Sequence, residues 1–465
     1  MRTALLYMMA GAIAALPLLG SAQDEESAEG ESPTEEAATD NVGFPGENGF
    51  GIKTEGSLQF SFAGGKQDKN FGKDHSYASS SGNLSFSPFV VLKNGAKAGG
   101  SIGFGADASN ALNCASGIST AYISVEGVFG TFNFGNQSGA AGLMSVDGTA
   151  VLGGQQGAAG MIGSIFNISG GAVVQTGCGA DDGIATKLVY MSPTWQGVQF
   201  GISYTPNSQS LGGLQNVTNV NYQYHMAGYL MQGNLQNSID KESLLLAAGT
   251  GGDPHSRTNP SSLPDVGTDL SNGAFYLDGI TAAVAYNYGS DDRFNGSFAV
   301  CGWTGKAKPQ VPKDDLEVEN VLAWQVGAIL GYKQFKVAAG FTDNGKSLMN
   351  KGGNVGKTPD GVQKGANMGK VVTAGVSFEQ NAWKATAGYY YSFKKYAEKD
   401  DETTGQVATV TVDYKFVEGF SVFAEYDHVK TKGRSTKEKR EWVNSTNPFE
   451  DNAGDFVFVG TKINF

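Results

Sequence analysis

The chain has 465 residues and a formal net charge of −12, with 67 glycines, 11% aromatic residues, 3 cysteines and 4 histidines. An acidic chain cannot neutralise phosphates, so the charge argues against nucleic-acid binding. Beyond the first 22 residues the sequence has no apolar run long enough for a spanning helix, which argues against a helical membrane protein.

The first segment, residues 1–22, predicts a secretory signal peptide. Arg2 supplies a positive start, Ala4 to Leu19 form an apolar core, and small residues end the segment at Ala22. We therefore expect export and cleavage after about Ala22, the alternative being a buried first helix.

The next segment, residues 23–50, is predicted to be an acidic, disordered periplasmic tail. Its first part, 23–40, carries eight acidic residues and no basic one. Such a segment cannot bury enough apolar surface to offset its ordering entropy. Without it, the rest of the chain is only mildly acidic.

From residue 51 to residue 465 the side chains alternate in character with period two. Ile52, Leu58 and Phe60 fall on one face, whereas Lys53 and Gln59 fall on the other. Period two indicates β-strands rather than helices. Many such strands with aromatic residues on the apolar face indicate lipid outside and water inside.

Sixteen strands are predicted, and short turns alternate with long polar loops between them. The strands are expected at 51–64, 77–93, 96–107, 120–126, 131–137, 185–192, 198–205, 271–278, 280–289, 319–331, 335–342, 369–379, 383–395, 405–416, 420–431 and 454–465. Asp278-Gly279 is one of the expected short turns. Residues 219–233 are also strand-like, so eighteen strands stay open. The pattern predicts an all-β, transmembrane antiparallel β-barrel with an aqueous lumen.

Three stretches resemble the general porin family of Gram-negative bacterial outer membranes. They are the hairpin from Leu188 to Gly201, the hairpin from Ala121 to Gly135, and the final strand that ends in Phe465. The resemblance covers residues 51–465. It implies a homotrimer of sixteen-stranded barrels in outer-membrane lipid, through which small hydrophilic solutes diffuse. It also implies that loop 138–184 folds into the lumen as a constriction, and that the outer-membrane assembly machinery recognises Phe465.

The same resemblance identifies candidate residues at the pore constriction. General porins commonly place arginines on the wall opposite the constriction loop, and the matching positions here are Asn83, Asn136 and Met191. None of these is basic, and Lys187 is the nearby wall cation.

The only acids on the loop are Asp147, Asp181 and Asp182, which are candidate constriction carboxylates or simply solvated side chains. Charges in a narrow lumen bias which ion enters. A mildly cation-preferring pore is therefore expected.

The three cysteines suggest one disulfide and one leftover thiol in an exported chain. All three fall in expected outer loops, Cys301 within 290–318. A bridge between Cys114 and Cys178, a bridge to Cys301, and unpaired thiols are all open. The histidines show no metal-ligand spacing, so we expect no metal and no cofactor.

Two short motifs suggest enzymes but lack the context that an enzyme requires. Gly340 to Ser347 matches a phosphate-binding loop, yet no helical pattern follows it. Gly99 to Gly103 matches a nucleophile elbow inside an alternating strand, with no histidine placed as its base. The favoured function is therefore an outer-membrane porin and not an enzyme. The alternative is a barrel that acts as a surface interaction or adhesion protein through long loops such as 206–270 and 290–318.

Overall fold

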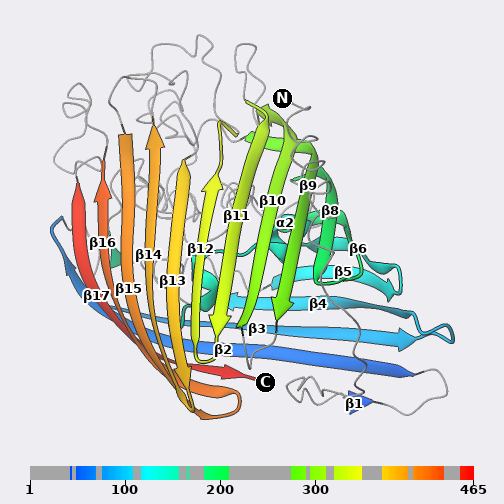
Figure 1. The fold of residues 1–465 in the computed structure, drawn as a ribbon, viewed down its shortest axis with the longest axis horizontal. Helices are drawn as coiled ribbons and strands as arrows, with labels where there is room; N and C mark the ends of the chain where they lie inside the picture. The colour runs from blue at the N-terminus through cyan, green and yellow to red at the C-terminus, as the bar shows by residue number, and fades with distance from the viewer. Residues whose placement is uncertain are drawn as a thin grey trace, which may run out of the picture. The chain divides into compact units, whose positions relative to one another are not determined.

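The computed structural model describes residues 42–43, 49–69, 76–107, 117–156, 165–166, 183–208, 274–289, 294–309, 319–347, 369–395, 402–433 and 451–465. Within these ranges no helix combines the length and apolar character needed to cross a membrane. Almost all of the described residues lie in one antiparallel sheet (Figure 1).

The sheet begins with a two-residue strand, β1 (Val42–Gly43), and continues with sixteen longer strands. The first eight are β2 (Phe50–Gln67), β3 (Ser76–Val91), β4 (Lys97–Asp107), β5 (Gly117–Gly127), β6 (Gly130–Gln137), β7 (Ala185–Met191), β8 (Val198–Asn207) and β9 (Ala274–Gly289). The other eight are β10 (Phe294–Pro309), β11 (Val321–Tyr332), β12 (Phe335–Asp343), β13 (Lys370–Gln380), β14 (Trp383–Lys395), β15 (Glu402–Val417), β16 (Phe420–Lys432) and β17 (Asn452–Asn464).

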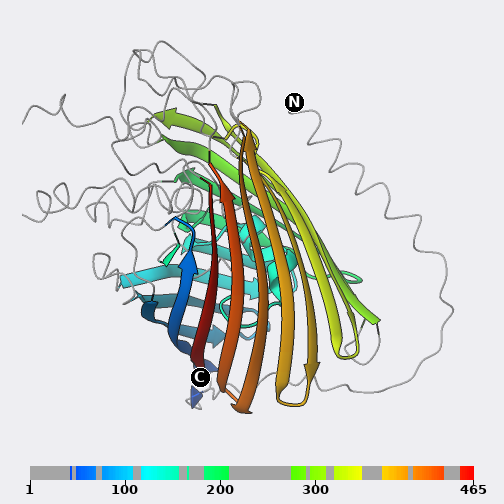
Figure 2. The ribbon, with the colours of Figure 1, turned by 90° about the vertical axis from the view of Figure 1, so that its left-hand side faces the viewer.

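The wall closes on itself because its last strand pairs with its first. Each strand from β2 to β16 pairs with the next along the chain, and β17 pairs with β2, Phe458 lying opposite Ala63. Figure 2 shows β17, in red, beside β2, in blue. The short β1 pairs only with β2 and adds nothing to the ring. The predicted sixteen-stranded β-barrel is confirmed.

The two faces of the wall follow the alternation of the sequence. Phe60, Phe62 and Val459 are exposed on the outer face, while their neighbours Ser61 and Phe458 are buried on the inner face. A closed barrel satisfies every backbone hydrogen bond between strands, so an apolar outer face can meet lipid without unpaired edges. Most short turns are confirmed as well, with a positive φ at Gly95, Lys333, Asn381 and Gly419.

One predicted turn is wrong, because Asp278-Gly279 lies inside β9. Asp278 does have turn-like geometry, with φ at +51°. However, the register with β10 slips between Thr304 and Lys306, so the extra residue is absorbed as a β-bulge and the strand continues. The expected strands 271–278 and 280–289 are therefore a single strand.

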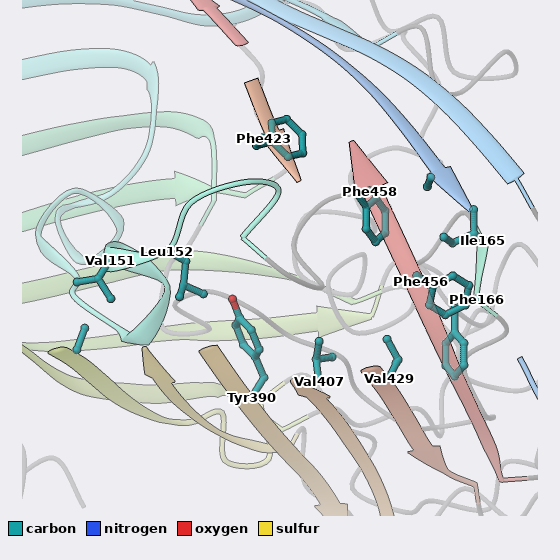
Figure 3. Packing of buried hydrophobic residues seen from close by; sticks show 12 residues of the cluster. Val151, Leu152, Ile165, Phe166, Tyr390, Val407, Phe423, Val429, Phe456 and Phe458 are labelled. Atoms are coloured by element: carbon teal, nitrogen blue, oxygen red, sulfur yellow. The ribbon is translucent and has the colours of Figure 1, made fainter. Parts of the chain in front are cut away.

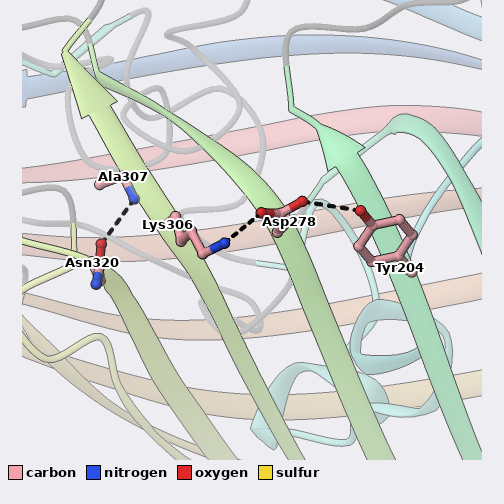
Figure 4. A network of polar contacts seen from close by, with 5 residues as sticks. All are labelled: Tyr204, Asp278, Lys306, Ala307 and Asn320. Carbon is pink, nitrogen blue, oxygen red and sulfur yellow. Dashed lines mark hydrogen bonds and ion pairs between the residues drawn. The ribbon is translucent and has the colours of Figure 1, made fainter.

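The bulge places a polar cluster on the outer face of the wall (Figure 4). Asp278 accepts a hydrogen bond from the Tyr204 hydroxyl at 3.0 Å and pairs with Lys306 at 2.8 Å. These contacts occupy both carboxylate oxygens. They explain why an Asp-Gly pair, normally a hairpin signal, is stable within a strand.

The strand count is still sixteen because β10 lies within the expected loop 290–318, which adds one strand where the joining of two expected strands removes one. Phe298 and Val300 are exposed on its outer face, while Ala299, Cys301 and Trp303 are buried on its inner face. Both faces are thus apolar, which removes the alternation by which a strand is recognised. The strand-like segment 219–233 lies outside the described residues.

Phe465 continues the pairing of β17 with β2. Its N–H donates to the Gly56 carbonyl at 3.0 Å, and the Gly56 N–H donates to the Phe465 carbonyl at 2.7 Å. The ring covers Gly56 so closely that a Cβ there would lie 2.6 Å from it. The aromatic ring therefore packs over the seam where the barrel closes.

We expect Phe465→Ala to lower the yield of folded barrel, since the ring contact at the seam is lost while the backbone pairing is retained. Heat-modifiable electrophoretic mobility of the outer-membrane fraction measures the folded yield. Phe465→Tyr keeps the ring and should fold as well as the parent. An alanine variant that folds as well as the tyrosine variant would contradict this role.

Candidate functional site

The loop between β6 and β7 lies against the inner face of the wall. Its described part begins with the short helix α2 (Ala140–Met144) and the 3₁₀ turn η2 (Gly148–Val151). Helix α2 contacts strands β7 to β10, and η2 contacts β11 to β14. For the described residues 138–156 and 165–166, the expectation that loop 138–184 folds into the lumen is confirmed.

Helix α2 lies close to the wall because its residues and those beneath it are small. Ala140 and Ala141 are fully buried. The N–H of Ala140 donates to the Ser203 hydroxyl and that of Ala141 to the Thr281 hydroxyl, both at 3.4 Å. Two of the backbone N–H groups at the start of the helix are thus paired with β8 and β9.

The next stretch of the loop lies in a groove formed by glycines on four consecutive strands. We call these residues the glycine groove: Gly327, Gly340, Gly375 and Gly388. A Cβ at Gly327 would lie 1.8 Å from the Val146 carbonyl oxygen, and one at Gly375 would lie 2.2 Å from the Gly148 oxygen. Only residues without a side chain allow the loop backbone to approach the wall this closely.

Polar side chains beside the glycine groove hold the loop backbone in place. The Gln325 side-chain amide donates to the Val146 carbonyl at 3.1 Å. The Gly148 N–H donates to the Thr373 hydroxyl at 2.8 Å. Both wall residues are buried, so each bond also satisfies a polar group that water does not reach.

Asp147 lies in this stretch, with its Cβ and Cα against Gly340. One carboxylate oxygen accepts hydrogen bonds from the Thr149 N–H at 2.7 Å and from the Thr149 hydroxyl at 2.6 Å. Burial raises the pKa of this carboxyl group, and the bonds from Thr149 offset part of that rise. The main structural role of Asp147 is therefore to cap the η2 turn.

Beyond η2 the loop is held by two wall carboxylates, Asp413 and Glu425, which we call the acidic anchor. The Gly154 N–H donates to Asp413 at 3.0 Å, and the Gln155 N–H donates to Glu425 at 2.6 Å. The Lys462 ammonium group donates to the Gly154 carbonyl. These bonds involve charged groups and are worth about 1.5–3 kcal/mol each.

An apolar cluster fills the space between the loop and strands β14 to β17 (Figure 3). Phe166 packs edge-to-face on Phe456 with ring centroids 5.9 Å apart. The cluster includes the loop residues Val151, Leu152, Ile165 and Phe166 and the wall residues Tyr390, Phe423, Phe456 and Phe458. Burying each large side chain contributes about 1.5–3 kcal/mol. The loop is thus packed as part of a core on this side of the lumen.

Among the described residues, those predicted to line the constriction do not form one cluster. Asn83 is exposed on the inner face of β3 and accepts a hydrogen bond from the Ser57 hydroxyl at 3.1 Å. Met191 also faces inward, but it packs beneath α2. Lys187 is inward and fully buried, and its ammonium group donates to the Gly183 carbonyl at 2.5 Å.

The assignment of Asn136 to the pore wall is wrong. It lies opposite Thr186 and shares the outer face of β6 with the exposed Phe134, which lies opposite the exposed Leu188. The alternation of Phe132 and Phe134 already marks even positions of this strand as outward. The resemblance pointed to the correct strand but to the wrong face.

Other predicted residues fall elsewhere. Cys301 is not in a loop: it is a buried, unbridged cysteine on the inner face of β10. Asp181, Asp182, Cys114 and Cys178 lie outside the described residues. Within the described ranges, no group of three or more histidine, cysteine, aspartate or glutamate side chains is placed to hold a metal ion.

Sequence reasoning missed both the glycine groove and the acidic anchor, although signals for both existed. Gly375 and Gly388 occupy inward positions of alternating strands, where a polar side chain is expected. Asp413 and Glu425 are likewise inward in strands whose other inward residues include several threonines. Glycines and acids aligned on the inner face would have indicated a wall that receives a loop.

We expect Glu425→Gln to loosen the stretch of the loop just beyond η2, because a neutral amide accepts the Gln155 N–H more weakly than a carboxylate does. Single-channel traces should show more frequent current fluctuations, with the mean conductance preserved or slightly raised. Glu418→Gln, at an exposed turn carboxylate paired with Lys415, is the matched control. Identical current noise in the two variants would show that the anchor does not restrain the loop.

Comparisons with known proteins agree with this architecture. The sequence profile described as Gram-negative porin matches residues 9–434. An uncharacterized protein of Rickettsia bellii is 23% identical over 294 residues, which cover 60% of this chain and 57% of that protein. A protein of Rickettsia prowazekii is 23% identical over 295 residues with the same coverage. The chain thus matches little more than half the length of these relatives.

Solved structures with a similar chain path include two bacterial outer-membrane channels. An anion-selective porin from Comamonas acidovorans is 16% identical, with a TM-score of 0.48 over 90% of this chain and 100% of that one. The channel DcaP of Acinetobacter baumannii is 13% identical, with a TM-score of 0.48 over 91% and 99%. Because the family profile spans most of the sequence, the chain belongs to the Gram-negative porin family.

Proposed function

We propose that this outer-membrane barrel is a water-filled channel for passive diffusion of ions and small hydrophilic solutes. The observation that carries the proposal is the asymmetry of the lumen. The described part of the loop packs against inner-face residues of β7 to β16, whereas inner residues of β3 such as Ser81 and Asn83 stay exposed. A polar, solvated strip beside a packed loop is what a narrowed aqueous path requires.

We further propose a mild preference for cations. No arginine occurs on the inner wall within the described ranges. Carboxylates are present on the loop at Asp147 and on the wall beside it at Asp413 and Glu425. Asp181 and Asp182 would add to this negative side of the constriction. Low-dielectric walls focus the electric field of such charges. The carboxylates are partly paired, however, so the discrimination between cations and anions is weak.

The test is a recording from purified protein in planar lipid bilayers. Stable conductance steps support the channel, and reversal potentials of cation-selective sign in a salt gradient support the preference. The selectivity should fade as salt concentration rises, since screening shortens the reach of lumen charges. A folded barrel without conductance would end the channel proposal, and a preference for chloride would end the cation preference alone.

Several features of the mature protein belong to the same proposal. Signal peptide 1–22 is removed, and the part of segment 23–50 that precedes β1 is a periplasmic tail, since Val42, Gly43 and Phe50 pair within the sheet. Three barrels assemble into a homotrimer with the help of the outer-membrane assembly machinery. We assign a channel role rather than a catalytic one, and neither a metal nor a cofactor. Non-reducing peptide mapping distinguishes a Cys114–Cys178 bridge from free thiols.

A further inference from the structure

The open side of the lumen is lined by side chains that are polar but uncharged. We call six of them the hydroxyl strip: Ser57, Gln59, Ser81, Asn83, Ser85 and Ser101. They are exposed or half-buried, and they share the inner face of β2, β3 and β4, since Gln59 lies opposite Ser81 and Ser57 opposite Asn83. The outer face of the same strands carries exposed phenylalanines such as Phe60 and Phe86.

Charged residues on β2, β3 and β4 beside the hydroxyl strip lie toward the strand ends, and Asp107, the last residue of β4, lies opposite Ser81 at the long-loop end. Lys53 and Glu55 are paired with each other at 2.7 Å, and Lys97 lies over the Phe89 ring. On the inner face of β3, from Tyr77 to Phe89, every residue is neutral. The central part of the open wall therefore offers hydroxyl and amide groups and no fixed charge.

The loop side of the passage is also almost free of charged residues over its described length. Between residues 138 and 156 the single charged residue is Asp147, and its carboxylate is engaged by Thr149. Leu143 and Ala150 are exposed on the loop surface. A solute in this passage thus meets neutral polar groups on one side and small or apolar groups on the other.

The cost of removing water from a solute decides which solutes such a passage favours. A charged solute that loses part of its hydration in a narrow passage needs an opposite charge on the wall to recover the cost. A neutral, hydroxyl-rich solute can exchange its water hydrogen bonds for bonds to serine and asparagine at little net cost. We infer that the channel favours small neutral polyhydroxylated solutes, such as hexoses, over charged solutes of equal size, and that the hydroxyl strip is the surface along which they pass.

This inference rests on the proposed channel function, and a matched set of probes separates the two. Osmotic swelling of proteoliposomes is measured with D-glucose, D-glucosamine and D-glucuronate, which share one ring size and differ in charge. Glucose should enter several-fold faster than glucuronate and faster than glucosamine. Equal rates for the three sugars, with salt conductance intact, would overturn the solute preference alone. The absence of both swelling and conductance would overturn the channel function.

A second measurement identifies the surface involved. The double variant Ser81→Ala, Ser85→Ala removes two hydroxyl groups and slightly widens the passage. A purely steric pore would then pass glucose faster, whereas the inference requires slower entry of glucose relative to salt conductance. Ser80→Ala, on the outer face of β3, is the matched control and should change neither. Faster glucose entry through the double variant would show that the hydroxyl strip does not assist passage.

Discussion

Gly375→Leu should displace the constriction loop and raise the single-channel conductance above that of the parent protein. A Cβ at this position would already lie 2.2 Å from the Gly148 oxygen, and further atoms would meet Val151 and Leu152. Overpacking of this kind costs about 1–3 kcal/mol if the structure stays in place. The wall is held by ladders of backbone bonds to both neighbouring strands, so the loop is the part that moves.

The matched control for this substitution is Gly302→Leu. Gly302 lies on β10 beside the outward-facing Val300, and a Cβ there meets nothing closer than 3.8 Å. Both variants add the same side chain to the wall, on opposite faces. If the leucine variant folds poorly, Gly375→Ala can replace it, and its smaller side chain should raise the conductance by less. A folded Gly375 variant with the parent's conductance would show that the loop does not limit the current.

Asn83→Arg should move the reversal potential strongly toward anions. Asn83 is exposed in the middle of the hydroxyl strip, and on the inner face of β3 from Tyr77 to Phe89 every residue is neutral. A single fixed positive charge among hydroxyl and amide groups attracts anions and repels cations, and it is opposed only by carboxylates that are already partly paired. The expected result is a change in the sign of selectivity at low salt, with a smaller change at high salt.

Asn136→Arg provides the control because it changes the same residue type on a nearby strand. Asn136 shares the outer face with Phe134 and Leu188, so its arginine does not enter the passage. Reversal potentials of this variant should equal those of the parent. If Asn136→Arg shifted selectivity as much as Asn83→Arg, the charge would act through the loops or the surface rather than through the passage.

Local sequence patterns are sufficient to predict the barrel. Alternation such as that of Leu58, Phe60 and Phe62 defines an outer face, and turns such as Glu418-Gly419 define where strands reverse. These signals are local, because side-chain direction in a strand depends only on the parity of the position. The same parity argument failed at β10, where both faces are apolar, and at Asp278, where a bulge has the dihedral geometry of a turn.

Which inward side chains meet water depends on contacts that form only in the folded barrel. Parity places Lys187 and Asn83 on the same inner face, yet Lys187 is buried and Asn83 is exposed. The difference arises from the loop, whose contacts join residues far apart in the chain: Gly148 bonds Thr373, 225 positions away, and Gln155 bonds Glu425, 270 positions away. Such contacts depend on the shape of the whole inner wall, including the glycine groove. Inward glycines and acids indicate that the wall receives a loop, but no local pattern encodes which wall residues that loop covers once the barrel has closed.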